Sequence, residues 1–147
     1  MVCGVKQRGS NITSERLRID FSHGAKMTPE QIAAVEKIVN EEIALALPVV
    51  RSTLPKDEAE QLGAEHEFGA KYPDMVSVYS VGPLNASPEN PKFDEAFSIE
   101  FCGGPHVENT SELATSTTTS TPLGAKFKIL KEEAVASGIR RIKAVLQ

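Results

Sequence analysis

Two segments in the first third of the chain have clear hydrophobic periods. Apolar and polar residues alternate over residues 16–22, which predicts a β-strand with one buried face. Apolar residues recur every three or four positions over residues 32–47, which predicts an amphipathic helix of roughly five turns that ends at Pro48. Thr28 can cap this helix, and Gln31 can complete a capping box.

Shorter periodic segments follow, and they mix strands with one further helix. A polar helix is predicted to end at Gly63, and the three prolines of residues 82–91 indicate a surface excursion. The strands are expected at residues 49–53, 75–81, 97–101, 126–130 and 139–145, and the helix at residues 56–62. No regular alternation of strand and helix is present, so we expect an α+β fold, mostly antiparallel sheet packed with helices.

The composition is that of a soluble globular protein, and the length favours a single domain over residues 1–147. The sequence is 40% hydrophobic and 24% charged, and no apolar run approaches the roughly 20 residues of a membrane helix. We expect a cytoplasmic protein with no membrane contact, because the start lacks a secretory signal and two cysteines make no disulfide framework. The net charge of −4 argues against DNA binding by the chain as a whole, so any RNA contact requires a local basic area.

The densest chemical signal is a cysteine followed four positions later by a histidine. A predicted strand leads directly into Cys102, and two glycines then let the backbone turn before His106. Thiolate and imidazole both bind zinc, but zinc sites take three or four protein ligands. On spacing alone, a core cysteine beside a surface histidine explains the pair better than a metal site does.

The segments around this pair resemble alanyl-tRNA synthetase. The similar stretches are GSNITSERLRIDFSH, MTPEQIAAVEKIVNEEI, FCGGPHVENTSEL and KFKILKEEAVASGIRRIKAVL, in the family's order. They extend over about residues 5–146 and cover the second additional domain that alanyl- and threonyl-tRNA synthetases share with free-standing alanyl-tRNA editing proteins. The resemblance therefore implies an editing-domain-like α+β fold.

The resemblance also implies an activity, a cofactor and site residues. The family hydrolyses the ester of serine or glycine wrongly attached to alanine tRNA, in a pocket that holds Zn²⁺. By this resemblance Cys102 and His106 are metal ligands, and Gln7 is a catalytic residue that orients water or the amino acid. An ordinary glutamine at a strand edge is the alternative for Gln7.

The family's other two zinc ligands are histidines of an H-x3-H motif on a helix that precedes the position of Gln7. Only six residues precede Gln7 here, so we expect a domain truncated at its N-terminal side, with an incomplete zinc site that the rest of a synthetase or a partner chain completes. The alternative is a non-catalytic tRNA-binding or assembly module derived from the editing domain. The threonine-rich tract at residues 115–122 is expected to be an inserted low-complexity loop.

Basic residues gather toward the C-terminus and are candidates for contact with alanine tRNA. These candidates are Lys126, Lys128, Arg140 and Arg141. Such a run is more often a solvated charged face, and the resemblance is what favours RNA.

Overall fold

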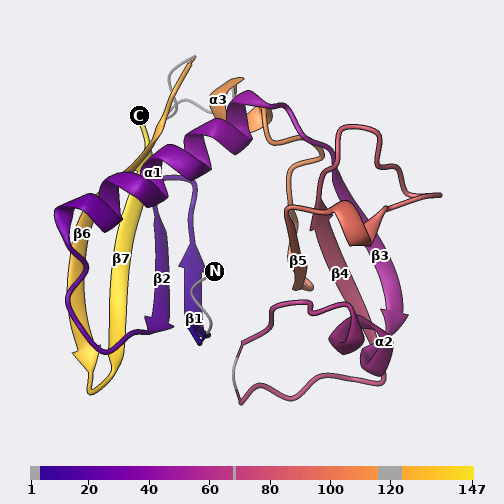
Figure 1. The fold of residues 1–147 in the computed structure, drawn as a ribbon, viewed down its shortest axis with the longest axis horizontal. Coiled ribbons are helices and arrows are strands. Elements are labelled where there is room, and N and C mark those ends of the chain that lie inside the picture. Colours follow the sequence, from indigo (N-terminus) through magenta and orange to yellow (C-terminus); the bar gives the residue numbers. More distant parts are fainter. Residues whose placement is uncertain (1–3, 68, 116–123) are drawn as a thin grey trace. The chain divides into compact units, whose positions relative to one another are not determined.

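The computed structural model describes residues 4–67, 69–115 and 124–147, and the chain divides into two compact units (Figure 1). The first unit comprises Met1–Ala44 and Leu113–Gln147, and the second comprises Leu45–Glu112. The described residues form two antiparallel sheets and three α-helices, which confirms the expected α+β class. That both units make one domain stays a prediction. The expected loop insertion lies, apart from Thr115, outside the described residues.

The first unit contains a four-stranded antiparallel sheet. Its strands lie in the order β1 (Gln7–Ile12), β2 (Leu17–Ser22), β7 (Ile139–Leu146) and β6 (Phe127–Ala136). The predicted strand at residues 16–22 is therefore present as β2. Strand β6 continues beyond the predicted residue 130, because it pairs with β7 as far as the partners Ala136 and Ile139. Strand β1 was not predicted, since its polar sequence shows no apolar alternation.

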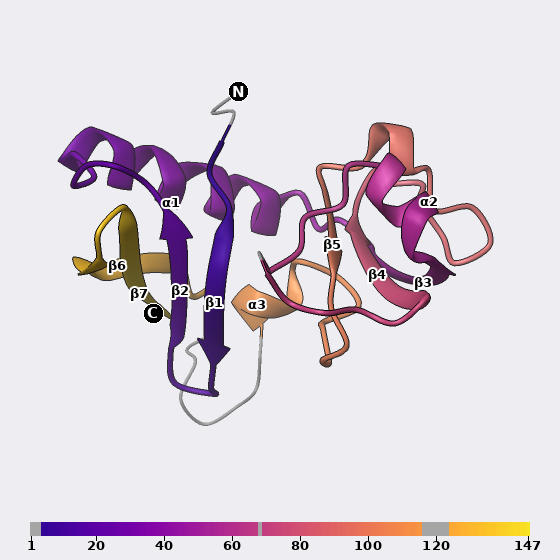
Figure 2. The ribbon, with the colours of Figure 1, turned by 90° about the horizontal axis from the view of Figure 1, so that it is seen from below.

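Helix α1 (Pro29–Ala44) covers one face of this sheet (Figure 2). The capping box forms as expected, because the Thr28 N–H donates to Gln31 Oε1 at 2.9 Å and the Gln31 N–H donates to Thr28 Oγ1 at 3.2 Å. Ile32 and Val35 pack against a core that includes Ile142. The helix ends at Ala44, three residues before the predicted end, because Ala46 adopts a left-handed backbone with φ of +52°. None of the described helices combines the length and apolarity that crossing a membrane requires.

Two arginine–carboxylate pairs in the first unit are each held by two hydrogen bonds. Asp20 is 7% exposed although it lies on the polar side of β2, and Arg141 donates to both of its carboxylate oxygens at 2.7 and 2.8 Å. Arg140 makes the same two-point pair with Glu132. Hydrogen bonds from these arginines lower the pKa of the Asp20 and Glu132 carboxyls below their ordinary values, although partial burial opposes the shift.

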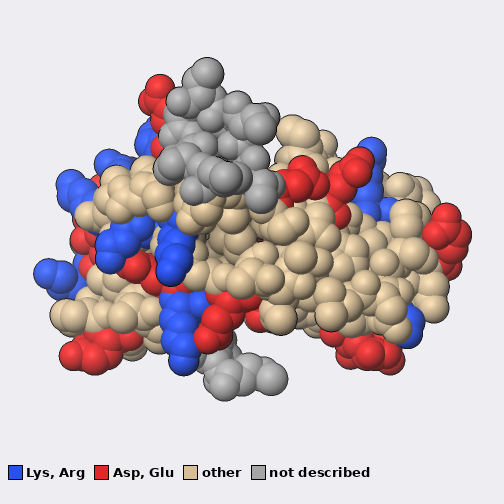
Figure 3. All heavy atoms as spheres, turned by 90° about the horizontal axis from the view of Figure 1, so that it is seen from above, with Lys and Arg blue, Asp and Glu red and all other residues tan. Residues whose placement is uncertain are grey.

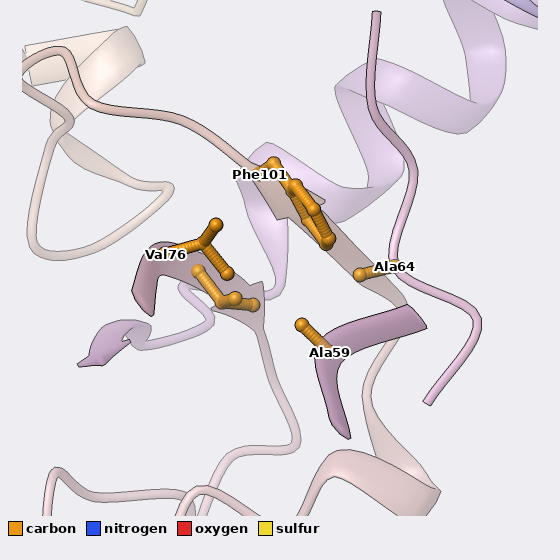
Figure 4. Packing of buried hydrophobic residues seen from close by; sticks show 5 residues of the cluster. Ala59, Ala64, Val76 and Phe101 are labelled. Carbon is orange, nitrogen blue, oxygen red and sulfur yellow. The ribbon is translucent and has the colours of Figure 1, made fainter. Parts of the chain in front are cut away.

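The second unit is built on a three-stranded antiparallel sheet in the order β3 (Val49–Pro55), β4 (Met75–Val81) and β5 (Ser98–Phe101). Helix α2 (Lys56–Gln61) follows β3 and ends as predicted, with Gly63 at a φ of +75°. A short 3-10 turn, η1 (Phe93–Glu95), precedes β5. Helix α3 (Glu112–Thr115) begins at the last residue of this unit, and its other residues belong to the first unit. Figure 4 shows the core of the unit, which contains Ala59, Ala64, Val76, Val78 and Phe101.

The capping box yields a first prediction. Thr28→Ala removes the hydroxyl that accepts from the first turn of α1, so the free energy of unfolding should fall by about 1 kcal/mol in urea denaturation. Thr28→Ser keeps a hydroxyl and should stay close to the original protein. Equal stability of the alanine variant and the original would contradict the role assigned to the cap.

The ion pairs yield a second prediction, which concerns pH. Because the pKa of Asp20 is lowered by folding, its pair stabilises the protein above the ordinary carboxyl pKa of 3.8 and is lost as pH falls through the lower folded value. Asp20→Asn should therefore lower the melting temperature at pH 7 and flatten its decline as pH falls through and below 3.8. Glu41→Gln is the control, since Glu41 pairs with Lys37 at the exposed surface of α1. Parallel melting curves for Asp20→Asn and the original protein would refute the assignment.

Candidate metal centre

Strand β5 delivers the candidate site and is held on both of its edges. On one edge it pairs with β4, and the Cys102 N–H extends this pairing by donating to the Ser77 carbonyl at 3.1 Å. On the other edge the backbone N–H of Glu65 donates to the Ile99 carbonyl, and the Glu65 carbonyl accepts from the Phe101 N–H, both at 2.8 Å. The end of the strand is thus fixed just before the two glycines that lead to His106.

Alternation along β5 sorts its side chains between two faces. Phe101 points into the core beside Val76 (Figure 4), so its neighbours Glu100 and Cys102 lie on the opposite face. This opposite face is therefore where the turn through Gly103 and Gly104 returns His106 to the sheet.

Three potential ligands gather on that face. One carboxylate oxygen of Glu100, the Cys102 sulfur and one ring nitrogen of His106 all lie within 4.8 Å of one another. The distance from His106 Nε2 to Glu100 Oε1 is 3.9 Å. The Glu100 and His106 side chains are 40% and 26% exposed, so the group is open to a ligand from outside.

Tyr79 fixes the orientation of the histidine. Its ring stacks on the His106 ring with centroids 4.0 Å apart and an angle of 28° between the planes. Its hydroxyl donates to the Gly104 carbonyl at 3.0 Å, which ties the turn between Cys102 and His106 to β4. One residue of β4 therefore holds both the imidazole and the backbone that carries it.

The donor set and its spacing fit zinc. Sulfur and nitrogen ligands of one tetrahedral zinc lie roughly 3.5 Å apart, given bond lengths of about 2.3 and 2.0 Å. Small side-chain rotations bring ligand atoms that start within 4.8 Å to that spacing. Zinc takes carboxylate as well as thiolate and imidazole, so Glu100, Cys102 and His106 could hold one ion together.

Glu100 is the member of this group that sequence reasoning missed. The signal was present, because residues two apart in a strand share a face and Glu100 precedes Cys102 by two. The C-x3-H spacing by itself does not point to the strand residues before it. The structure brings Cys102 and His106 together as expected, and metal binding by them stays a prediction.

The other histidines lie elsewhere. His66 packs against the rings of Tyr72 and Phe101, with centroid distances of 5.8 and 5.3 Å. His23 belongs to the first unit, where its ring lies 6.4 Å from that of Phe21. Neither belongs to the group of potential ligands among the described residues.

Gln7 opens β1 in the first unit, whereas Cys102 and His106 belong to the second. It is half-buried and pairs with Phe21, and the register shifts before Gly9, which has a φ of +141°. This irregularity turns the start of an edge strand. The catalytic role assigned to Gln7 stays a prediction.

The expected RNA-binding residues all lie in the first unit, and most of them already have acidic partners. Arg140 and Arg141 are held by Glu132 and Asp20 as described above, and Lys128 pairs with Glu36 at 3.1 Å. Lys126 is exposed, and its ammonium has no partner among the described residues. Figure 3 shows lysine and arginine interspersed with acidic side chains over this unit. Contact with RNA stays a prediction for all four.

Comparison with known proteins agrees with the resemblance drawn from the sequence. The family model described as the threonyl and alanyl tRNA synthetase second additional domain matches residues 76–116, which include β5, all of β4 except Met75, and the three potential ligands. The chain is similar to the alanine–tRNA ligase of Borreliella afzelii, with 49% identity over 97% of the chain. It is also similar to the alanine–tRNA ligases of Treponema denticola (45% identity over 100% of the chain) and Halalkalibacterium halodurans (43% over 96%).

The chain spans only part of these relatives. It covers 20% of the Borreliella afzelii protein, 21% of the Treponema denticola protein and 13% of the Halalkalibacterium halodurans protein. These matches confirm that the chain resembles a segment of alanine–tRNA ligases. The α+β fold agrees with the family model that matches.

The stacked pair yields a third prediction, measured by NMR without any metal. The Tyr79 ring shields the protons of the His106 ring, so Tyr79→Leu should move those resonances downfield, while Tyr79→Phe should leave them nearly in place. The His23 resonances are the internal control. Unchanged His106 resonances in Tyr79→Leu would show that the two rings do not stack in solution.

Proposed function

Because this chain is related over 97% of its length to a segment of alanine–tRNA ligases, we propose that it contributes to a zinc-dependent editing pocket of such an enzyme. The proposed reaction is hydrolysis of the ester that joins wrongly attached serine or glycine to alanine tRNA. Water adds to the ester carbonyl, the bond to the ribose oxygen breaks, and the products are the free amino acid and a tRNA with a free terminal hydroxyl.

One observation carries this proposal. Cys102 and His106, which spacing alone did not join, converge with Glu100 to within 4.8 Å on the open face of the sheet. The core behind Phe101 fixes the strand that carries Glu100 and Cys102, and the Tyr79 stack orients the His106 ring. Such preorganisation is what a site must have if a bound group is to be aimed at one bond of a substrate.

Each residue of the group has a proposed part. Cys102 and His106 would hold the zinc, and a bound zinc supplies a Lewis acid that polarises the ester carbonyl and acidifies water. Tyr79 keeps the His106 ring in the orientation that ligation needs. Glu100, 3.9 Å from His106 Nε2, accepts a hydrogen bond from the attacking water and can take its proton.

The proposed site takes further ligands from outside this sequence. The resemblance gives two more histidines from an H-x3-H helix, and the three histidines of the sequence contain no such motif. The rest of a synthetase or a partner chain would supply them. With those histidines in place, Cys102 and His106 complete four ligands, and Glu100 is left to contact water and substrate.

Metal binding gives a fourth prediction. Titration with Co²⁺ of the complete reading frame that contains this sequence should produce the absorption of a thiolate–cobalt bond, and Cys102→Ala should abolish it. His106→Ala should weaken Co²⁺ binding by more than the roughly 100-fold that loss of a residue behind the ligands can cost. His23→Ala is the control and should bind as the original does. Absence of thiolate–cobalt absorption from the complete protein would remove the metal from the proposal.

Hydrolysis is tested in the complete reading frame that contains this sequence. With zinc present, the protein should release serine from alanine tRNA that carries serine. Cys102→Ala should lose most of that activity while still binding tRNA. If the zinc-loaded original binds tRNA but releases no serine, the chain is instead a non-catalytic tRNA-binding module. If it neither hydrolyses nor binds this tRNA, an assembly role is the remaining alternative.

A further inference from the structure

Arg51 lies on β3 and carries a positive charge. Its side chain is exposed, and Nε and Nη2 donate to Ser77 Oγ at 3.3 and 3.0 Å. Within the described part of the chain no carboxylate forms an ion pair with it. Arg140 and Arg141 of the first unit, by contrast, are each neutralised by a carboxylate. Contact with a serine hydroxyl orients the guanidinium and leaves its charge uncompensated.

Arg51 shares a face of the sheet with the candidate metal centre. It lies directly opposite Tyr79 on β4, and Tyr79 lies directly opposite Glu100 on β5. Residues directly opposite each other in antiparallel strands point to the same side. The contact of Arg51 with Ser77 and the stacking of His106 on Tyr79 place all of these side chains opposite the core.

The spacing suits a ligand that is larger than an amino acid. Two neighbouring strands place the Cα atoms of Arg51 and Glu100 about 10 Å apart, and Tyr79 lies between them. A ligand whose ester lies at Glu100, Cys102 and His106 must therefore extend across Tyr79 to meet the guanidinium. An aminoacylated nucleotide has this form, with its ester at the ribose and its phosphate on the other side of the sugar.

We propose that Arg51 binds the phosphate of the terminal nucleotide that carries the amino acid, and so positions the ester at the candidate metal centre. The planar guanidinium offers two parallel donors to phosphate oxygens, and such charge-assisted pairs are among the strongest hydrogen bonds in proteins. Ser77 holds one side of the guanidinium and limits the rotations that binding would otherwise have to freeze. The inference rests on the proposed function, because it takes the ester and the phosphate to belong to one substrate.

Two small substrates separate this inference from the proposed function. One is adenosine 5′-monophosphate esterified with serine at its 3′ oxygen, and the other is the same seryl ester of adenosine without the phosphate. The complete reading frame with zinc should hydrolyse both. Arg51→Ala should lower kcat/KM for the phosphate-bearing ester by about 10- to 100-fold, mainly through KM, and leave the other ester within about twofold.

The controls use the same chain. Lys71→Ala removes an exposed positive charge from the second unit, and it should affect neither ester. Arg51→Lys should recover part of the lost kcat/KM, because a lysine retains the charge without the two-point geometry. Melting temperatures of the variants verify that each is folded.

The outcomes are distinct. An equal loss on both esters, or no loss on either, would overturn the assignment of Arg51 and leave the proposed hydrolysis intact. Failure of the original protein to hydrolyse either ester would overturn the proposed function and this inference with it.

Discussion

The candidate centre depends on how β5 is fixed within the second unit. Phe101 enters the core next to Val76 and Val78, and backbone hydrogen bonds to β4 and to Glu65 fix the strand on both edges. With the register fixed, alternation leaves Glu100 and Cys102 only one face to occupy. A shift by one residue would bury the carboxylate and the thiol and expose the phenyl ring, which is energetically costly. The packing of one aromatic residue thus determines where the chemistry lies.

Local patterns predicted the elements whose residues cooperate over short distances. The capping box joins Thr28 to Gln31, and the six residues of β2 are enough to show its alternation. Strand β1 escaped prediction because its residues are polar and mostly exposed, and what makes them a strand is pairing with β2. Propensity is a weak guide where a neighbouring strand supplies the hydrogen bonds.

Contacts between distant residues set the limit of sequence reasoning about the site. The pair of Cys102 and His106 was visible as a motif, whereas the Tyr79 stack joins residues 27 positions apart by number and has no local signature. The same holds for charge. The basic run at Arg140 and Arg141 is held by Asp20 and Glu132, and only the fold shows this. Arg51 is the charged residue of β3, and within the described part of the chain its guanidinium contacts a serine and no carboxylate. Clustering of charge in the sequence was therefore a poor measure of the charge available to a partner.

The pairing of Glu65 with β5 has a further effect on how separate molecules behave. An unpaired outer strand offers a row of backbone donors and acceptors onto which another chain can add. Here Glu65 already occupies the Ile99 carbonyl and the Phe101 N–H. An incoming strand would have to displace it first, so this border of the sheet resists self-association where the ligand-bearing face must remain accessible.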